Sequence, residues 1–433
     1  MNDILVLKKY ENILIYSCVF WALFNFAYNF TTFTGGGIGP IILRFKLNFI
    51  LEAYIALLFL FFFLNRSGSF TKNSRVTSAA LIAASGAFVY FMMHIVSLNY
   101  FIDKLLICLM LFFFLQLRNN VKYRIFNGFV KSLGILVFFS LIEFFIYLIF
   151  DFRVVVFSNI YYVDLLPGDF TLFNFMHQFS SLGHLIGIEH FYRFQSFTNE
   201  PGSLGTTSAL LIIAIGGNKH YRFEYVVFWI AGILTLSLAF FSLVFLHLIF
   251  LLYGRKQLVL FICFGFIAAF IYYNYSDFFE MIFDQRLKET DGNVDNRASY
   301  VLQERIERAW DDGSLWLGMG NEDANEATGS GVKLMLYQYG IVGVCVLVLS
   351  FMYSYLLLLK SRHLRNYSIC VFFFFAFWIN FYQRSDIFLF QYIIPYFCLP
   401  AFMKYYEVQS KTNLPEKSVK RISTVAINDQ LQQ

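Results

Sequence analysis

The sequence is poor in charge. Charged residues make up 14% of the chain and hydrophobic residues 58%, whereas soluble domains average about 25% charged residues. Apolar runs long enough to cross a bilayer recur from residue 13 to residue 403. A soluble fold is therefore excluded, and we expect an all-α polytopic membrane protein. The net charge of +5 indicates an inner-leaflet bias and not nucleic-acid binding.

Several residue patterns that other functions need are also missing. All six cysteines lie inside apolar runs, which argues against a disulfide framework and a cysteine metal site. The glycine cluster at 35–40 lacks the Gly-Lys-Ser/Thr of a phosphate-binding loop. The long outer segments defined below contain no Asp-x-Asp pair. We therefore expect neither a metal nor a cofactor.

The apolar runs predict about twelve transmembrane helices. The first run is too long for a signal-peptide core and lacks a small-residue cleavage site, so we expect a retained span. The segment 224–253 fits two spans or one long helix. The expected spans are 13–34, 41–64, 76–97, 101–117, 125–150, 203–217, 224–237, 240–253, 258–275, 331–359, 368–382 and 386–403.

Lysine and arginine placement orients these spans. With the N-terminus inside, every inner loop is basic, provided that 224–253 forms two spans. Both termini are then cytoplasmic, and residues 1–404 form one integral membrane domain followed by a polar tail at 405–433. Two long segments, about 151–202 and 276–330, lie outside. No cytoplasmic loop is large enough to hold a nucleotide-sugar or ATP site.

The outer segments are predicted to contain amphipathic helices. In residues 170–194, apolar side chains alternate with polar ones, which we interpret as one or two interfacial helices. A metal site is the alternative there, but the spacing of the polar residues matches no known ligand pattern. The residues concerned are His177, His184, Glu189 and His190.

The second outer segment contains RASYVLQERIERAW at 297–310. At about 100° per residue, Arg297, Arg305 and Arg308 fall within an arc of roughly 80°, opposite an apolar face. One interpretation is a solvated face paired with Glu304 and Glu307. The other is a diphosphate clamp, because guanidinium groups match phosphate oxygens bidentately.

A third polar stretch, RFQSFTNEPGSLG at 193–205, precedes an apolar run. Ionisable groups at the edge of a membrane span usually mark a site. Pro201 fits the first turn of the following helix, which would place Glu200 beside a helix N-terminus. Glu200 is then either a helix-end anchor or a general base, with Arg193 orienting a sugar or phosphate.

This stretch, the arginine-rich helix, and then LWLGMG (315–320) and GVKLMLYQYGIVG (331–343) together resemble the O-antigen polymerase and ligase superfamily. The local motifs cover only about 193–205 and 297–343. Ligases carry a His-Asn pair shortly before a Gly-x-x-Gly, whereas Gly329 and Ser330 occupy those positions here. Arg297 and Gly313 match an arginine–glycine spacing of some polymerases. The resemblance is therefore closer to the Wzy-type O-antigen polymerases.

The resemblance implies a bacterial inner-membrane glycosyltransferase that polymerises undecaprenyl-diphosphate-linked repeat units at the periplasmic face, without metal, releasing undecaprenyl diphosphate. The donor and acceptor glycans and membrane lipid are the implied partners, with a polysaccharide chain-length regulator as a further candidate. Glu200 is the expected catalytic residue. Arg193, Arg297, Arg305 and Arg308 are the expected substrate-binding residues. An O-antigen ligase and a lipid-linked oligosaccharide flippase are the alternatives.

The orientation is testable by thiol labelling. Cysteine introduced at Leu165 or Gly292 should react with an impermeant reagent applied from outside, because these positions lie in the outer segments. Cysteine at Phe70 or Asn120 should not react. Labelling at Phe70 in intact cells would invert the topology and would admit a cytoplasmic donor.

Overall fold

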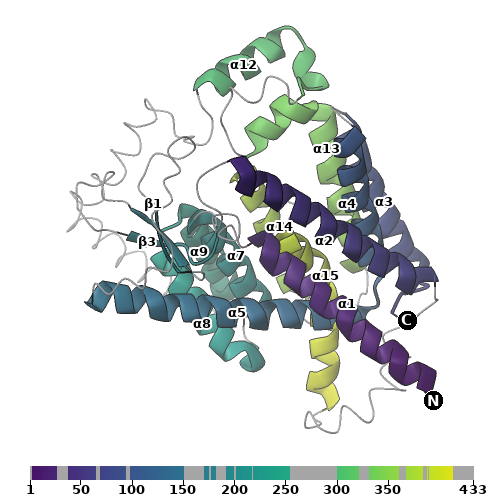
Figure 1. The fold of residues 1–433 in the computed structure, drawn as a ribbon, viewed down its shortest axis with the longest axis vertical. Helices are drawn as coiled ribbons and strands as arrows, with labels where there is room; N and C mark the ends of the chain where they lie inside the picture. The colour runs from purple at the N-terminus through teal and green to yellow at the C-terminus, as the bar shows by residue number, and fades with distance from the viewer. Residues whose placement is uncertain are drawn as a thin grey trace.

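The fold is mostly helical and is taken from a computed structural model (Figure 1). The structure describes residues 2–26, 38–64, 69–93, 98–150, 170–174, 177–181, 192–198, 201–216, 218–253, 300–320, 331–359, 367–383, 388 and 390–412. The α-helices in these ranges are α1 (Asn2–Phe26), α2 (Ile38–Leu64), α3 (Ser74–Met92), α4 (Leu98–Gln116), α5 (Asn119–Phe150), α7 (Pro201–Ile215), α8 (Arg222–Leu234), α9 (Leu238–Tyr253), α12 (Tyr300–Asp311), α13 (Val332–Leu359), α14 (Tyr367–Gln383) and α15 (Phe390–Thr412).

Each expected span overlaps one of these helices, with ends that differ by up to about ten residues, except 258–275, which lies outside the described residues. The segment 224–253 forms two helices, because the chain leaves the helical conformation at Thr235–Ser237 between α8 and α9. The arginine-rich segment also forms a helix, α12, as its amphipathic pattern predicts. The apolar runs therefore predicted the approximate positions of these helices.

Three helical segments are long and apolar enough to cross a membrane: Ser74–Met92, Asn119–Ile146 and Val332–Leu359. Shorter apolar helices accompany them. Large apolar side chains such as Leu57, Ile149 and Leu349 are about two-thirds exposed, as is typical of surfaces that face lipid or another partner. The expectation of membrane-spanning character is thus supported, whereas the count of twelve spans stays a prediction.

The first outer segment is not purely helical where it is described, and here the all-α prediction is wrong. Strands β1 (Phe170–Asn174), β2 (His177–Ser181) and β3 (Tyr192–Phe194) form an antiparallel sheet in the order β1-β2-β3. Thr171 pairs with Phe179, and Ser180 pairs with Arg193. The apolar–polar alternation that we interpreted as an interfacial helix has the period of two that belongs to strands.

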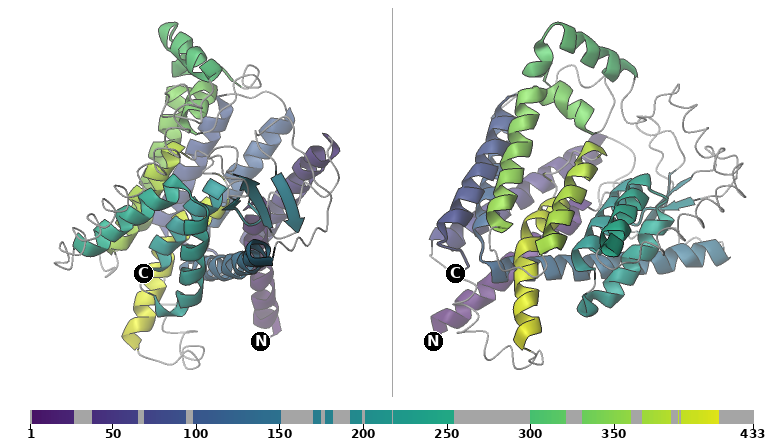
Figure 2. Two further views of the ribbon diagram at one scale, coloured as in Figure 1. Left: turned by 90° about the vertical axis from the view of Figure 1, so that its left-hand side faces the viewer. Right: turned by 180° about the vertical axis from the view of Figure 1, so that it is seen from behind.

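Helix α3 packs against both α4 and α13, and the three helices run beside one another (Figures 1 and 2). Five of its seven buried residues are alanine or glycine, which lets the neighbouring backbone approach closely. A Cβ on Gly86 would lie 1.9 Å from Ser350 Oγ on α13, so no larger residue fits there. The hydroxyl of Ser354 on α13 donates to the carbonyl of Ala79 at 2.9 Å.

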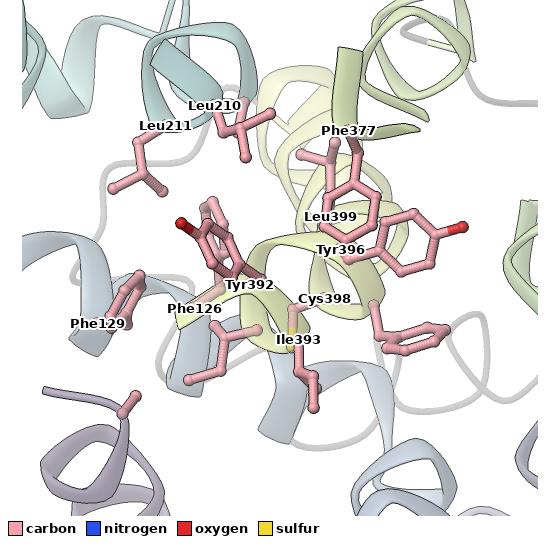
Figure 3. Close-up of a cluster of buried hydrophobic side chains, with 14 of the residues drawn as sticks. Phe126, Phe129, Leu210, Leu211, Phe377, Tyr392, Ile393, Tyr396, Cys398 and Leu399 are labelled. Carbon is pink, nitrogen blue, oxygen red and sulfur yellow. The ribbon is translucent and has the colours of Figure 1, made fainter. Parts of the chain in front are cut away.

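Helix α15 forms the centre of the aromatic core. Figure 3 shows side chains of α5, α7 and α14 gathered around it. Tyr396 accepts a hydrogen bond from Trp378 Nε1 at 3.1 Å and lies 4.2 Å, centroid to centroid, from Phe377. Helix α7, which packs against α8, α9, α14 and α15, is buried along its whole length. The polar 193–205 stretch therefore continues directly into the interior of the protein.

A kink in α13 frees backbone carbonyls that bind the segment after α12. Gly340 has φ 71° and ψ 167° inside the helix, so the preceding carbonyls need donors from elsewhere. The backbone N–H of Met319 donates to Tyr337 O at 2.7 Å, and that of Gly320 donates to Gln338 O at 3.1 Å. Figure 1 shows the resulting cap, in which α12 lies above the first turns of α13.

The kink depends on two glycines. A Cβ on Gly340 would lie 2.4 Å from the Leu317 carbonyl carbon, and one on Gly318 would lie 2.4 Å from Gly340 N. Both contacts are to backbone, which cannot rotate away as a side chain can. Both glycines also have positive φ, a conformation that costs other residues about 1–2 kcal/mol.

We predict that Gly340→Ala releases the 314–320 segment from α13. The positive φ alone should raise amide hydrogen exchange of Met319 and Gly320 about 5- to 30-fold, and the backbone clash adds to this. The measurement is hydrogen exchange of the purified protein, followed by mass spectrometry.

Gly343→Ala is the matched control, because a Cβ at Gly343 would have no contact closer than 3.4 Å. Unchanged exchange at Met319 in the Gly340→Ala protein would contradict the role of the kink.

Candidate functional site

The predicted site residues fall into two regions. The first, which we call the Arg193 turn, comprises residues 192–198 together with the α8–α9 turn at 235–237. The second is the arginine helix, α12. Glu200 and Arg297 lie outside the described residues. In Figures 1 and 2, α12 and β3 lie at different places on the molecule, so Arg193 is not gathered with the arginines of α12.

Arg193 joins the strand β3 to the α8–α9 turn. Its Nε donates to Thr235 O at 2.9 Å, and Nη2 lies 3.5 Å from Leu236 O. The turn that it holds is strained, because Leu236 has φ 49°, and a non-glycine residue in that region costs about 1–3 kcal/mol. Arg193 thus stabilises a turn whose carbonyls have left the helical ladder.

The residues after Arg193 form a buried, tightly bonded turn. Thr198 Oγ1 donates to Gln195 O at 2.7 Å, and Gln195 Nε2 donates to Thr198 O at 3.0 Å. Ser196 has φ 54°, and its hydroxyl donates to Ser140 Oγ on α5 at 2.8 Å. Two strained non-glycine residues are thus close to Arg193: Ser196, three residues further along the chain, and Leu236 in the turn that Arg193 contacts. Such outliers cluster at functional sites.

Helix α7 begins directly after this turn. It starts at Pro201, as the first-turn preference of proline predicts, and Glu200 is the residue before it in the sequence. Several buried polar atoms, in the turn and in the first half of α7, have no hydrogen-bond partner within the described part of the chain: Gln195 Oε1 and the hydroxyls of Thr206, Thr207 and Ser208. Buried atoms of this kind call for water or a ligand.

The α8–α9 turn packs directly on α7. A Cβ on Gly205 would lie 2.7 Å from Thr235 Oγ1 and 2.8 Å from Ser237 Cβ. Gly205, the second glycine of the Pro-Gly-Ser-Leu-Gly stretch, is therefore needed for the close packing of α7 on this turn. No local sequence pattern indicates this contact, because it joins segments that are about thirty residues apart.

The arginine helix has one buried face and one exposed face. Leu302 and Ile306 pack against Tyr337 and Leu334 of α13. On the other side, Arg308 forms an i,i+4 ion pair with Glu304, which is the local pairing that we gave as the alternative to a phosphate clamp. Arg305 is partly exposed and lies about 60° from Arg308 around the helix axis.

The end of α12 is fixed by capping. Gly313 ends the helix with φ 76°, and Ser314–Trp316 form a 3₁₀ turn, η3. The backbone N–H of Ser314 donates to Asp312 Oδ1 at 2.8 Å. Hydrogen bonds from the Ser314 hydroxyl and backbone lower the pKa of the Asp312 carboxyl, which is therefore ionised at neutral pH. The C-terminal end of the arginine helix is thus capped by its own following residues.

No described group of three or more His, Cys, Asp or Glu residues could hold a metal ion. His177 lies on β2, whereas His184, Glu189 and His190 lie outside the described residues. The chain matches no protein-family model, no curated protein and no solved structure.

We predict that Arg193→Ala destabilises the protein through the α8–α9 turn. Hydrogen bonds from charged donors are worth about 1.5–3 kcal/mol, and the carbonyls of Thr235 and Leu236 would lose theirs. Arg193→Lys should restore part of this stability, because one ammonium group cannot replace the guanidinium fork.

The measurement is thermal unfolding in detergent. Arg222→Ala is the control, since Arg222 is exposed at the start of α8. Equal melting temperatures for Arg193→Ala and Arg222→Ala would show that Arg193 does not support the turn.

Proposed function

We propose that the protein is a polytopic inner-membrane glycosyltransferase of the Wzy-type O-antigen polymerase class. It would extend a surface polysaccharide from undecaprenyl-diphosphate-linked repeat units at the periplasmic face, with twelve spans and cytoplasmic termini. The observation that carries the proposal is the rigid attachment of α12 to α13. An arginine-bearing helix is held by backbone hydrogen bonds at the end of a helix that could cross a membrane. Such a helix end is where a lipid diphosphate would lie.

The chemistry of the transfer fits arginines in that place. The departing undecaprenyl diphosphate carries the developing negative charge, which positioned cations stabilise. The ion pair between Arg308 and Glu304 is largely exposed, and i,i+4 pairs of this kind contribute only about 0.3–0.5 kcal/mol. A diphosphate oxygen can therefore replace Glu304 at little cost, and the guanidinium can bind it bidentately.

The acceptor hydroxyl must also lose a proton. We assign this role to Glu200, because it immediately precedes the buried start of α7 and follows the strained Arg193 turn. The unpartnered buried atoms of Gln195 and Thr206 provide polar groups at the same end of α7. Arg193 would act there by holding the α8–α9 turn and by orienting a sugar or phosphate.

Gel analysis of the surface glycan in a deletion strain tests the reaction class. Loss of the ladder with one repeat unit still attached supports the polymerase. Complete loss of glycan favours an O-antigen ligase, and lipid-linked repeats that accumulate inside the cell favour a flippase. An unchanged ladder would contradict the proposed role in polysaccharide synthesis.

In a complemented deletion strain, we predict that Glu200→Gln abolishes polymer while the protein stays at its normal level in the membrane. Loss of a positioned acid–base group typically costs about 10²–10⁴-fold in rate. Arg305→Lys and Arg308→Lys should shorten or abolish the ladder, since lysine keeps the charge but loses the fork.

Two substitutions serve as controls. Glu304→Gln removes the partner of Arg308 without removing the arginine, and it should leave the ladder intact. Arg222→Lys changes an exposed arginine outside the site and should also be silent. A full-length ladder from Glu200→Gln would make Glu200 a helix-end anchor, and the base would have to be another residue.

A further inference from the structure

Helices α2 and α4 bring together two carboxyl groups and one ammonium group. Glu52 lies on α2, and Asp103 and Lys104 lie near the start of α4; we call them the carboxyl–lysine cluster. Lys104 Nζ is 2.7 Å from Asp103 Oδ2. Helix α2 packs against α4, and the carboxyl group of Glu52 interacts electrostatically with both Asp103 and Lys104. This cluster plays no part in the proposed glycosyl transfer.

The Glu52 end of the cluster is shielded from solvent. The side chain of Glu52 belongs to the buried set, with 8% of the residue exposed. Its Oε2 atom has no hydrogen-bond partner within the described part of the chain. Asp103 and Lys104 have side chains that are 31% and 22% exposed, so the cluster opens toward the start of α4.

Aromatic rings surround the ammonium group. Lys104 Nζ lies 5.4 Å from the centroid of the Phe91 ring and 5.2 Å from that of the Tyr100 ring. These two rings favour a cation. The Tyr100 hydroxyl lies 3.0 Å from the Tyr339 hydroxyl. Tyr339 immediately precedes Gly340, so the cluster is linked to the kink that holds α12.

Charge balance decides the protonation of this cluster. With every group ionised, Glu52, Asp103 and Lys104 would carry a net charge of −1 in a poorly solvated place. Two carboxylates in contact cannot both be ionised without a strong penalty. The ammonium group contacts Asp103 directly, which favours its ionised form. The remaining proton therefore belongs on Glu52, where the O–H donates to Asp103 and the cluster becomes neutral.

We propose that Glu52 and Asp103 form a proton-binding site, in which Glu52 holds the proton, Asp103 accepts its hydrogen bond, and Lys104 balances the charge of Asp103. Proton release breaks the O–H bond of Glu52 and delivers the proton to water through the open side at Asp103. It leaves a net charge of −1 beside the Tyr100–Tyr339 contact. This inference does not depend on the glycosyltransferase proposal.

Few other titratable groups face the cluster from the described neighbouring helices. Cys108 follows Lys104 by one turn on α4 and interacts electrostatically with it. Tyr100 and Tyr339 provide the two hydroxyls already described, and Tyr90 on α3 stacks on Tyr339 with ring centroids 4.0 Å apart. On α1, Glu11 is paired with Arg124. No second ammonium or guanidinium group described in these helices contacts Glu52.

Infrared spectroscopy of the purified full-length protein tests the proposal directly. The carbonyl stretch of a protonated carboxyl group should be present at neutral pH and should disappear in Glu52→Gln. Glu143→Gln is the matched control, because Glu143 lies on a different apolar helix, α5. Isotopically labelled glutamate in the unsubstituted protein should shift the same band, so the assignment does not require the variant to fold.

The stability of Glu52→Gln at different pH values distinguishes a proton-binding site from an ordinary ion pair. Glu52→Gln should keep the melting temperature at neutral pH, since the amide N–H can donate to Asp103 as the protonated carboxyl does. Raising the pH should then destabilise the unsubstituted protein more than Glu52→Gln. Absence of a protonated glutamate band, or a band that Glu52→Gln leaves unchanged, would overturn the proposal. Glycan polymerisation is a separate measurement, so failure of either proposal does not decide the other.

Discussion

The constraint on which the structure depends is that backbone groups buried among apolar helices need partners within the protein. Three interruptions between or within the described helices meet this need with a specific donor. Arg193 donates to the carbonyls of the α8–α9 turn. At the α4–α5 junction, the buried Lys122 donates to Leu115 O at 2.6 Å. At the kink of α13, the donors are the backbone N–H groups of Met319 and Gly320.

This constraint explains why charged side chains occur in so apolar a chain. Lys122 and Arg193 donate hydrogen bonds to backbone carbonyls, and Arg124 forms an ion pair with Glu11 at 2.6 Å. Lys104 forms an ion pair with Asp103. A charged donor at a helix end gives a stronger hydrogen bond than a neutral one, and the charge itself needs compensation in a poorly solvated place. Most of these charges are therefore part of the architecture, and their presence alone does not mark a substrate site.

The sequence predicted the helices well and the contacts between them poorly. Hydrophobic runs and the 297–310 pattern follow from local periodicity, so α12 and both helices of 224–253 were predictable, as was the start of α7 at Pro201. The sheet at 170–194 was missed because an alternating pattern was interpreted as interfacial helix. The contact between Gly318 and Gly340, and that between Gly205 and Thr235, join distant segments. Local pattern carries no information about these contacts. The glycines in LWLGMG and YQYG were the one sequence feature that could have indicated a close approach of the backbone.

The two groups of predicted site residues differ in how their charges are used, and that difference suggests where a substrate binds. Arg193 is committed to backbone carbonyls that would lose their donors if it moved, so a ligand there must add to its contacts. Arg308 forms an exposed ion pair with Glu304, and water or an anion can replace that partner at little cost in free energy. The helix that carries Arg308 is nevertheless held rigidly by the glycine contact at Gly340. A rigid backbone with an exchangeable charge is the combination that binding a diphosphate requires, which makes α12 the stronger of the two regions for anion recognition.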